Sequence, residues 1–233
     1  MLKNLTLIVL CGVFFTDAAS AQKTESKTKV EQPAAATPTL KKSNRRPSVK
    51  SLNSAAAEPF EKAGVETMGA QCVKLETEAG VIDLEMFPES APETVRSFLN
   101  LVGSGAFDTT TFSRVVPGFV IQGGDLATRG KLTPEMARRA GRAIADEPNL
   151  IKHERGIVSM ARSDAPNSAT TNFFILVGEA PFLDGKFAAF GRVARGMETV
   201  DAVNKMPVEG DKPKKPVSIS RATVAPCSSE TKP

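Results

Sequence analysis

The feature that most constrains the fold is a series of short apolar stretches that recurs between residues 71 and 224. Val73, Leu75 and Thr77 alternate with charged residues, and Gly80 leads into a second such stretch, which is typical of a β-hairpin. Further strands are expected at 110–116, 119–122, 157–161, 173–177, 188–193 and 217–224. Many short strands separated by turn residues predict a mainly β domain.

Two stretches have helical periodicity instead. From Val95 to Val102, apolar residues recur at i, i+3, i+4 and i+7, after a capping-box pattern at Ser90–Glu93 and before Gly103. A second amphipathic helix is expected at residues 197–206. Short strands combined with two such helices favour a closed antiparallel β-barrel whose ends are covered by helices.

The first residues have the pattern of a secretory signal peptide. Lys3 precedes an apolar run at residues 5–15, and Ala19-Ser20-Ala21 has the small-x-small pattern of a cleavage site before Gln22. We therefore expect residues 1–21 to be removed and the protein to be secreted or periplasmic. The apolar run is too short for a transmembrane helix, which needs about 20 residues, so no stable membrane insertion is expected.

Residues 22–65 have the composition of a linker, rich in Pro, Ala, Ser and Lys. Residues 22–62 contain nine Lys or Arg and four Glu, so this segment alone carries a net charge of +5. The whole chain has a net charge of +4. The folded part, expected at residues 66–228 before a short tail at 229–233, is therefore about neutral. A nucleic-acid partner is not expected, because binding would need a basic patch on the domain.

The segment FSRVVPGFVIQGGD (residues 112–125) sets one arginine among apolar β-forming residues. Strand alternation would place Phe112 beside Arg114 on one face, and Phe119 beside Ile121 on one face of the next strand. An arginine in an apolar strand is costly to bury without a partner. Arg114 is therefore either an ordinary surface residue or a polar group that acts beside an apolar floor.

This segment resembles the central signature of the cyclophilins, the peptidyl-prolyl cis–trans isomerases. Residues 156–177 (GIVSMARSDAPNSATTNFFILV) and 182–193 (FLDGKFAAFGRV) resemble two further blocks of that family, in the same order. The resemblance implies a barrel of eight antiparallel strands with two capping helices. It also implies an enzyme that rotates X–Pro bonds in exported proteins and assists their folding. We expect proline-containing polypeptides as partners, a monomer, and no cofactor or metal.

The resemblance also implies roles for individual residues. Arg114, Gln122 and Phe119 would be catalytic, with Gln122 orienting Arg114 or contacting the substrate carbonyl. The remaining substrate contacts would come from Val120, Ala161, Arg162, Asn172, Phe174, Leu183 and Phe187. A donor aimed at the proline nitrogen would favour the twisted transition state over both ground states.

The chain departs from the family pattern at several positions. Ser113 and Phe187 stand where histidine is usual, Asn172 replaces glutamine, and Phe182 replaces a tryptophan. Loss of the indole donor implies that cyclosporin binds only weakly. Residues 126–147 replace a glycine-rich loop. Thr133, Pro134 and Glu135 have the pattern of a helix start, so we expect an inserted helical turn beside the groove for residues that precede the proline.

Cys72 and Cys227 lie near the two ends of the folded part. In the cyclophilin fold the first and last strands are neighbours, so we hypothesise that these cysteines form a disulfide, which an oxidising compartment would permit.

Other functions remain open at this point. The chain could be a proline-peptide binding module or chaperone with little turnover, or a scaffold that acts through its basic linker. A serine hydrolase would depend on the single histidine, His153, but no G-x-S-x-G motif is present. We interpret His153 as a structural residue.

Overall fold

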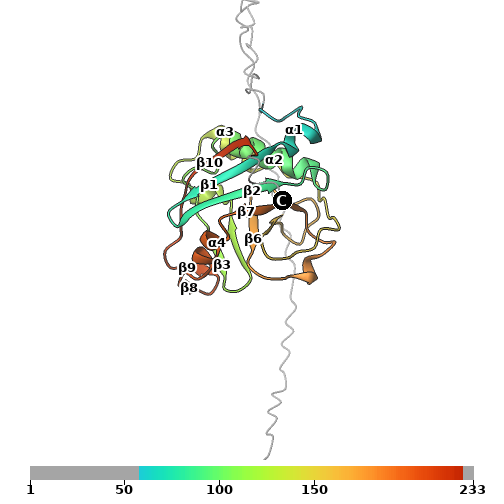
Figure 1. Ribbon diagram of the computed structural model, residues 1–233. Coiled ribbons are helices and arrows are strands. Elements are labelled where there is room, and N and C mark those ends of the chain that lie inside the picture. The colour runs from blue at the N-terminus through green and yellow to red at the C-terminus, as the bar shows by residue number, and fades with distance from the viewer. Residues whose placement is uncertain (1–57, 228–233) are drawn as a thin grey trace, which may run out of the picture. The chain divides into compact units, whose positions relative to one another are not determined.

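The computed structural model describes residues 58–227 (Figure 1). The signal peptide and most of the linker expected from the sequence lie outside these residues. The elements follow in the order α1 (Val65–Gly69), β1 (Gln71–Thr77), β2 (Gly80–Met86), α2 (Pro92–Gly103), β3 (Arg114–Val116), β4 (Val120–Gly123), η1 (Leu126–Thr128), α3 (Pro134–Ala140), β5 (Ile157–Met160), β6 (Phe173–Leu176), η2 (Pro181–Leu183), β7 (Ala189–Arg195), α4 (Met197–Asn204), β8 (Val208–Glu209), β9 (Lys212–Pro213) and β10 (Ile219–Pro226).

Eight strands form one antiparallel sheet in the order β10-β1-β2-β7-β5-β6-β4-β3. The sheet curls so that its two ends approach each other, but no ladder joins β3 to β10. The ends meet only through the isolated bridge between Thr111 and Ser218 and neighbouring backbone bonds such as Phe112 N–H to Val217 O, 3.0 Å. The closed barrel expected from the sequence is therefore wrong. The strand at 110–116 shortens to Arg114–Val116, which leaves too little extended chain to close the sheet.

The main hydrophobic core fills the inside of the curl. Phe98 of α2 packs against three other buried rings, with centroid distances of 5.4 Å to Phe107, 5.3 Å to Phe173 and 4.9 Å to Phe190. Val95, Leu99 and Val102, on the same apolar face of α2, are buried as well. In Figure 1, α2 lies at the top of the sheet and α4 at the bottom. Burial of these aromatic side chains is the main stabilising contribution that the sequence supplies.

The N-terminus of α2 is capped by a residue that is distant in the sequence. Ala91 occupies the N-cap position and makes no side-chain hydrogen bond, so the capping box predicted at Ser90–Glu93 is wrong. The backbone N–H groups of Glu93 and Thr94 instead donate to the Glu147 carboxylate, at 2.9 and 2.8 Å. A carboxylate at this position satisfies free N–H groups and complements the helix dipole.

Residues 58–64 pack against the domain, although the sequence places them in the linker. The N–H of Phe60 donates to Oδ1 of Asn100 (2.8 Å), and Arg96 donates to the carbonyl groups of Phe60 and Ala63. Phe60 also packs against the main core. The ordered part of the chain therefore begins before residue 66.

A small hairpin, β8–β9, lies against β3. The N–H of Val115 donates to the Asp211 carbonyl at the tip of this hairpin, at 2.8 Å. Asn204, at the end of α4, holds the β3–β4 turn by accepting from Gly118 N–H (2.8 Å) and donating to the carbonyls of Val116 and Val120. Gly118 has φ of 75°, a conformation that glycine adopts without strain. Both contacts fix the strand that carries Arg114.

Cys72 and Cys227 form a disulfide, as hypothesised, with 4.9 Å between their Cα atoms. The bond joins β1 to the residue that follows β10, and these two strands are adjacent in the sheet. No helix among residues 58–227 is both long enough and apolar enough to cross a membrane.

Candidate active site

A cavity of about 180 Å³ opens on the outer face of the curled sheet. A second hydrophobic cluster forms its floor, with Val120 from β4, Phe174 and Leu176 from β6, and Leu183 from η2. Their neighbours Ile121, Phe173 and Ile175 point into the main core. Strand alternation therefore gives the sheet two apolar faces, one for folding and one that is open to a ligand.

Two of the predicted face assignments are wrong. Phe112 is fully buried in the main core, whereas Arg114 faces the cavity. Phe119 packs with the outer cluster, whereas Ile121 points into the core. Both errors have one cause: β3 begins only at Arg114 and β4 only at Val120, so period-two alternation does not extend to Phe112 or Phe119.

The cavity brings together nearly all of the residues that the sequence singles out. Its lining consists of Arg114, Phe119, Val120, Gln122, Ala161, Arg162, Phe174, Leu183 and Phe187. Asn172 does not line it. The Asn172 backbone carbonyl accepts from Ala161 N–H (2.9 Å), and its side-chain Oδ1 is enclosed without a hydrogen-bond partner among the described residues. The expected contact between the Asn172 side chain and a substrate main chain therefore stays a prediction.

Arg114 forms an ion pair with Asp211 at the wall of the cavity. Oδ2 of Asp211 lies 2.9 Å from Nη2 and 3.0 Å from Nε of Arg114. The Arg114 and Asp211 side chains are 41% and 55% exposed. An ion pair as exposed as this one contributes only about 0.2–1 kcal/mol to stability. Its main consequence is geometric, because Nη1 of Arg114 has no partner among residues 58–227 and lies beside an apolar floor.

Gln122 lies directly opposite Arg114 in the β3–β4 ladder. No hydrogen bond joins the two side chains in the described part of the chain, and the guanidinium pairs with Asp211 instead. In this conformation Gln122 therefore does not orient Arg114 through a side-chain hydrogen bond, and its contact with a substrate carbonyl stays a prediction. The sequence did not identify Asp211 as a site residue, because no local pattern shows which distant residue a charged side chain in a hairpin turn will contact.

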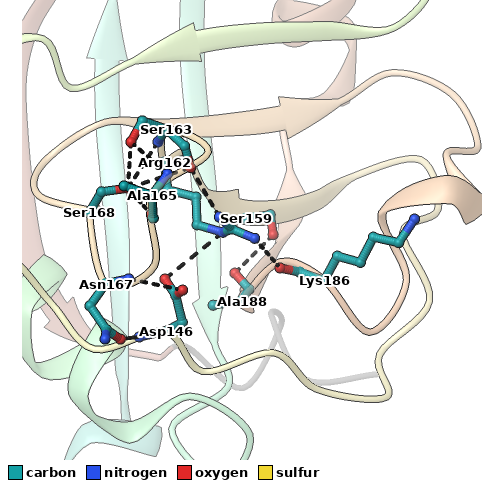
Figure 2. Close-up of polar contacts among 9 residues, drawn as sticks. All are labelled: Asp146, Ser159, Arg162, Ser163, Ala165, Asn167, Ser168, Lys186 and Ala188. Atoms are coloured by element: carbon teal, nitrogen blue, oxygen red, sulfur yellow. Dashed lines mark hydrogen bonds and ion pairs between the residues drawn. The ribbon is translucent and has the colours of Figure 1, made fainter.

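Arg162 lines one side of the cavity, and Figure 2 shows its polar contacts. Its guanidinium lies 5.1 Å from the centroid of the Phe187 ring and donates to the carbonyls of Ser163 (3.0 Å) and Lys186 (3.3 Å). Nε lies 3.9 Å from Oδ1 of Asp146. A guanidinium held over an aromatic ring in this way fixes both groups.

The loop that follows Arg162 is held by short polar contacts (Figure 2). Oγ of Ser168 accepts from Ser163 N–H (3.1 Å) and donates to the Ala165 carbonyl (2.6 Å). Asn167 and Asp146 exchange two hydrogen bonds, Asp146 N–H to Oδ1 of Asn167 (2.8 Å) and Asn167 N–H to Oδ2 of Asp146 (3.0 Å). The loop is therefore tied to the segment that follows α3.

The inserted segment lies mainly away from the cavity. Arg139 of α3 pairs with Glu58 (2.7 Å) and donates to Oγ of Ser97 on α2 (2.9 Å). Thr133 caps α3, as the sequence predicts, by accepting from Met136 N–H (3.2 Å). Only Asp146 reaches the cavity wall, through Arg162. The helical turn expected beside the binding groove exists, but it packs on α2.

Aromatic rings form the rest of the cavity wall. Phe174 and Phe187 meet edge to face with centroids 6.0 Å apart, and Phe119 lies 5.6 Å from Phe182. Phe182 is 59% exposed at the rim, although it is large and apolar.

His153 belongs to a buried network behind this wall. Nδ1 of His153 lies 3.1 Å from Oδ1 of Asp184, and Nε2 lies 3.1 Å from Oγ of Ser159. Oγ of Ser159 also donates to the Ala188 carbonyl (2.8 Å; Figure 2). Ser159 and His153 are closed to solvent, so no ester or peptide substrate can reach the hydroxyl. The arrangement resembles a hydrolase triad in composition only, and its role is structural.

Asp184 is the most perturbed carboxyl group near the cavity. The backbone N–H of His153 donates to it (2.8 Å), and Lys152 donates to its other oxygen (3.0 Å). These hydrogen bonds, the backbone bond first, lower the pKa of Asp184 to about 2. Asp184 follows Leu183, so an ionised carboxylate anchors the end of the turn that supplies the cavity floor.

Size alone does not identify the site. A larger cavity of about 670 Å³ lies along α1 and β2, and it contains none of the residues that the sequence singles out. Within residues 58–227, no group of three or more His, Cys, Asp or Glu side chains is arranged to hold a metal ion. The chemistry of the smaller cavity, a cation beside an aromatic floor, suits an apolar ring next to a carbonyl or an imide nitrogen.

The structure thus combines a curled antiparallel sheet with an arginine and aromatic rings around a cavity on its outer face. Residues 72–224 match the family model described as "Cyclophilin type peptidyl-prolyl cis-trans isomerase/CLD". The chain belongs to this cyclophilin family, whose members are peptidyl-prolyl cis–trans isomerases.

The chain is similar to several proteins of this family. It is 39% identical over 158 residues to peptidyl-prolyl cis-trans isomerase cypE of Dictyostelium discoideum, a match over 67% of this chain and 99% of that protein. It is 39% identical over 143 residues to CYP23 of Arabidopsis thaliana, a match over 60% of this chain and 63% of that protein.

A solved structure is also similar to the chain. It is the cyclophilin type peptidyl-prolyl cis-trans isomerase of Cryptosporidium parvum in the presence of the dipeptide Ala-Pro. The TM-score is 0.59 at 31% identity, over 66% of this chain and 98% of that one.

Proposed function

We propose that the described domain catalyses rotation about X–Pro bonds in the cavity on the outer face of the sheet. The observation that carries this proposal is the position of Arg114, which lines the cavity together with Phe119, Phe174 and Leu183. The aromatic floor would hold the proline ring, while the guanidinium would donate to the imide nitrogen. Gln122, which has no side-chain partner in the described part, would bind the substrate carbonyl.

The size of the rotation barrier shows how much of its lowering the Arg114 donor and the aromatic floor would each have to supply. Amide resonance sets a barrier of about 18–20 kcal/mol, and the twisted transition state gives the nitrogen back its lone pair. A million-fold acceleration needs about 8 kcal/mol, at 1.36 kcal/mol per tenfold. One preorganised donor supplies about 3–4 kcal/mol. The rest must come from holding the ring and its flanking carbonyl in the twisted geometry.

The test is isomerisation of a short proline peptide, followed by exchange NMR or by a protease-coupled assay. Arg114→Ala should lower kcat/KM by about 10²–10³-fold. Arg155→Ala is the matched control, because Arg155 has similar exposure and a similar ion pair, with Asp201, but does not line the cavity. Equal losses in both variants would contradict the proposed role of Arg114.

A proline-peptide binding module is the rival function. It predicts that the parent protein binds the peptide without measurable turnover and that Arg114→Ala changes neither result. Exchange NMR separates the two functions in one sample, because it detects binding and interconversion at the same time.

The site of action is also part of the proposal. The signal-peptide pattern at residues 1–21 and the Cys72–Cys227 disulfide both support export to the periplasm or the outside of the cell. We propose that the substrates are exported polypeptides whose folding is limited by proline isomers. Fractionation of cells that produce the full chain, followed by mass determination of the mature N-terminus, tests the location and the removal of residues 1–21.

We also propose that the domain acts as a monomer and binds cyclosporin only weakly. Phe182 at the cavity rim has no hydrogen-bond donor on its ring, and this supports weak binding of a polar cyclic peptide. Inhibition at nanomolar cyclosporin would contradict this part of the proposal, and light scattering of the purified domain tests the oligomeric state.

A further inference from the structure

We infer that Asp211 is a positioning residue for Arg114 and that the β8–β9 hairpin belongs to the catalytic apparatus. Oδ2 of Asp211 takes N–H donors from both Nε and Nη2 of Arg114, at 3.0 and 2.9 Å. The inference rests on the proposed function, because it states what holds the catalytic cation in place.

The hairpin is attached to the strand that carries Arg114. The backbone carbonyl of Asp211 accepts from the N–H of Val115, the next residue along β3, at 2.8 Å. Backbone and side chain of one residue therefore bind two consecutive residues of β3. The backbone contact holds the main chain of Asp211 beside β3, so only the short Asp211 side chain has to be ordered for its carboxylate to meet the guanidinium. We infer that this pairing sets the direction of the guanidinium before a substrate arrives.

The geometry leaves part of the guanidinium for the substrate. Nε and one N–H of Nη2 point to Asp211, whereas Nη1 has no partner among the described residues. An arginine side chain is flexible, and its planar donor group is useful only in one orientation. Preorganised donors act most strongly when no reorganisation is needed during the reaction. Asp211 supplies this preorganisation.

Gln122 does not supply this preorganisation of Arg114. The residue lies opposite Arg114 across the ladder but makes no hydrogen bond with its side chain.

The exposed ion pair between Arg114 and Asp211 adds little to folding stability, so its removal should affect turnover much more than the free energy of unfolding.

The experiment compares Asp211→Ala with Asp201→Ala in the full chain. Asp201 pairs with Arg155 at 2.7 Å and does not line the cavity. Asp211→Ala should lower kcat about tenfold with KM unchanged within twofold, equivalent to about 1.4 kcal/mol. Asp211→Glu should recover part of the loss, and Asp201→Ala should leave kcat and KM unchanged.

A readout that does not depend on turnover is the NMR signal of the Arg114 Nε–H group. Its chemical shift and its exchange with water should change in Asp211→Ala and remain unchanged in Asp201→Ala. Residual turnover of Arg114→Ala should be insensitive to a further Asp211→Ala change, because Asp211 acts through Arg114.

Three results would overturn the inference: wild-type kcat in Asp211→Ala, an equal fall in Asp201→Ala, or an Arg114 signal that does not move. Higher activity in Asp211→Ala would also overturn it, since the ion pair would then be inhibitory. Absence of turnover in the wild type would instead contradict the proposed function, and the NMR signal would still report whether Asp211 orients Arg114.

Discussion

The carboxylate of Asp184 accepts the backbone N–H of His153 at 2.8 Å and lies 3.1 Å from Nδ1 of the same residue. Through Nε2, the imidazole also lies within hydrogen-bond distance of Ser159 on β5. The network therefore joins the turn that carries Leu183 to the strand that leads to Ala161. Both Leu183 and Ala161 line the cavity, so a residue that never touches a ligand determines the position of its floor and wall.

The first prediction concerns the acid stability of this network. The pKa of Asp184 is lowered to about 2 in the folded protein, against about 3.9 in an unfolded chain. The stabilisation is fully present above pH 4 and is lost as the pH falls from about 4 towards 2. Asp184→Asn should lower the unfolding midpoint at pH 7, and the difference from wild type should shrink below pH 4. Thermal unfolding across this pH range is the measurement, and a pH-independent difference would contradict the prediction.

The second prediction concerns the disulfide. Cys72 and Cys227 are 155 residues apart in the sequence, so the bond closes a long loop and restricts the unfolded chain. Reduction should lower the free energy of unfolding by about 2–5 kcal/mol. Denaturant titration with and without reductant measures the change, and the Cys72→Ser, Cys227→Ser double variant should be insensitive to reductant.

The third prediction concerns the cap of α2. Glu147→Gln should destabilise the domain by about 0.5–2 kcal/mol, because its carboxylate accepts two backbone N–H groups at the helix N-terminus. Glu76→Gln is the control, since Glu76 is exposed on β1 and belongs to no helix. Equal unfolding midpoints for the two variants would show that the long-range cap does not contribute.

The fourth prediction concerns the wall formed by Arg162. Arg162→Ala removes the guanidinium from Phe187 together with two hydrogen bonds to carbonyl groups, so KM should rise several-fold while kcat changes little. Arg162→Lys should not restore KM, because an ammonium group cannot make the same planar contacts.

Asp146→Asn provides the comparison for Arg162. Asp146 lies 3.9 Å from Nε of Arg162, which is too far for a strong hydrogen bond, so its effect on KM should be smaller. A larger effect from Asp146→Asn than from Arg162→Ala would show that the loop, rather than the cation, shapes the wall.

Local patterns in the sequence predict much of the fold. The hairpin β1–β2, the buried stripe of α2 and the Thr133 cap of α3 are all confirmed, because each depends on residues within a few positions of one another. The errors occur where an element ends. Phe112 and Phe119 lie just outside β3 and β4, and alternation assigns their side chains to the wrong faces.

Long-range contacts of the site could not be predicted in this way. Asp211 is 97 residues from Arg114, and Glu147 is 54 residues from Glu93. Neither acidic residue has a local pattern that distinguishes it from other exposed carboxylates. The same limit explains the open sheet, since the shortening of β3 depends on how the β8–β9 hairpin and α4 pack against it.

By itself, the sequence determined most of the strands and helices, because backbone preference acts over short distances. The aromatic residues that accompany Arg114 followed from the resemblance to the cyclophilins, since alternation alone assigned Phe112 and Phe119 to the wrong faces. The tertiary structure decided which charged groups meet. Asp211 orients the arginine, Asp184 holds the cavity floor, and Glu147 caps α2. Such pairs form only when the chain folds distant segments together, and electrostatic attraction then acts between groups that the sequence keeps far apart.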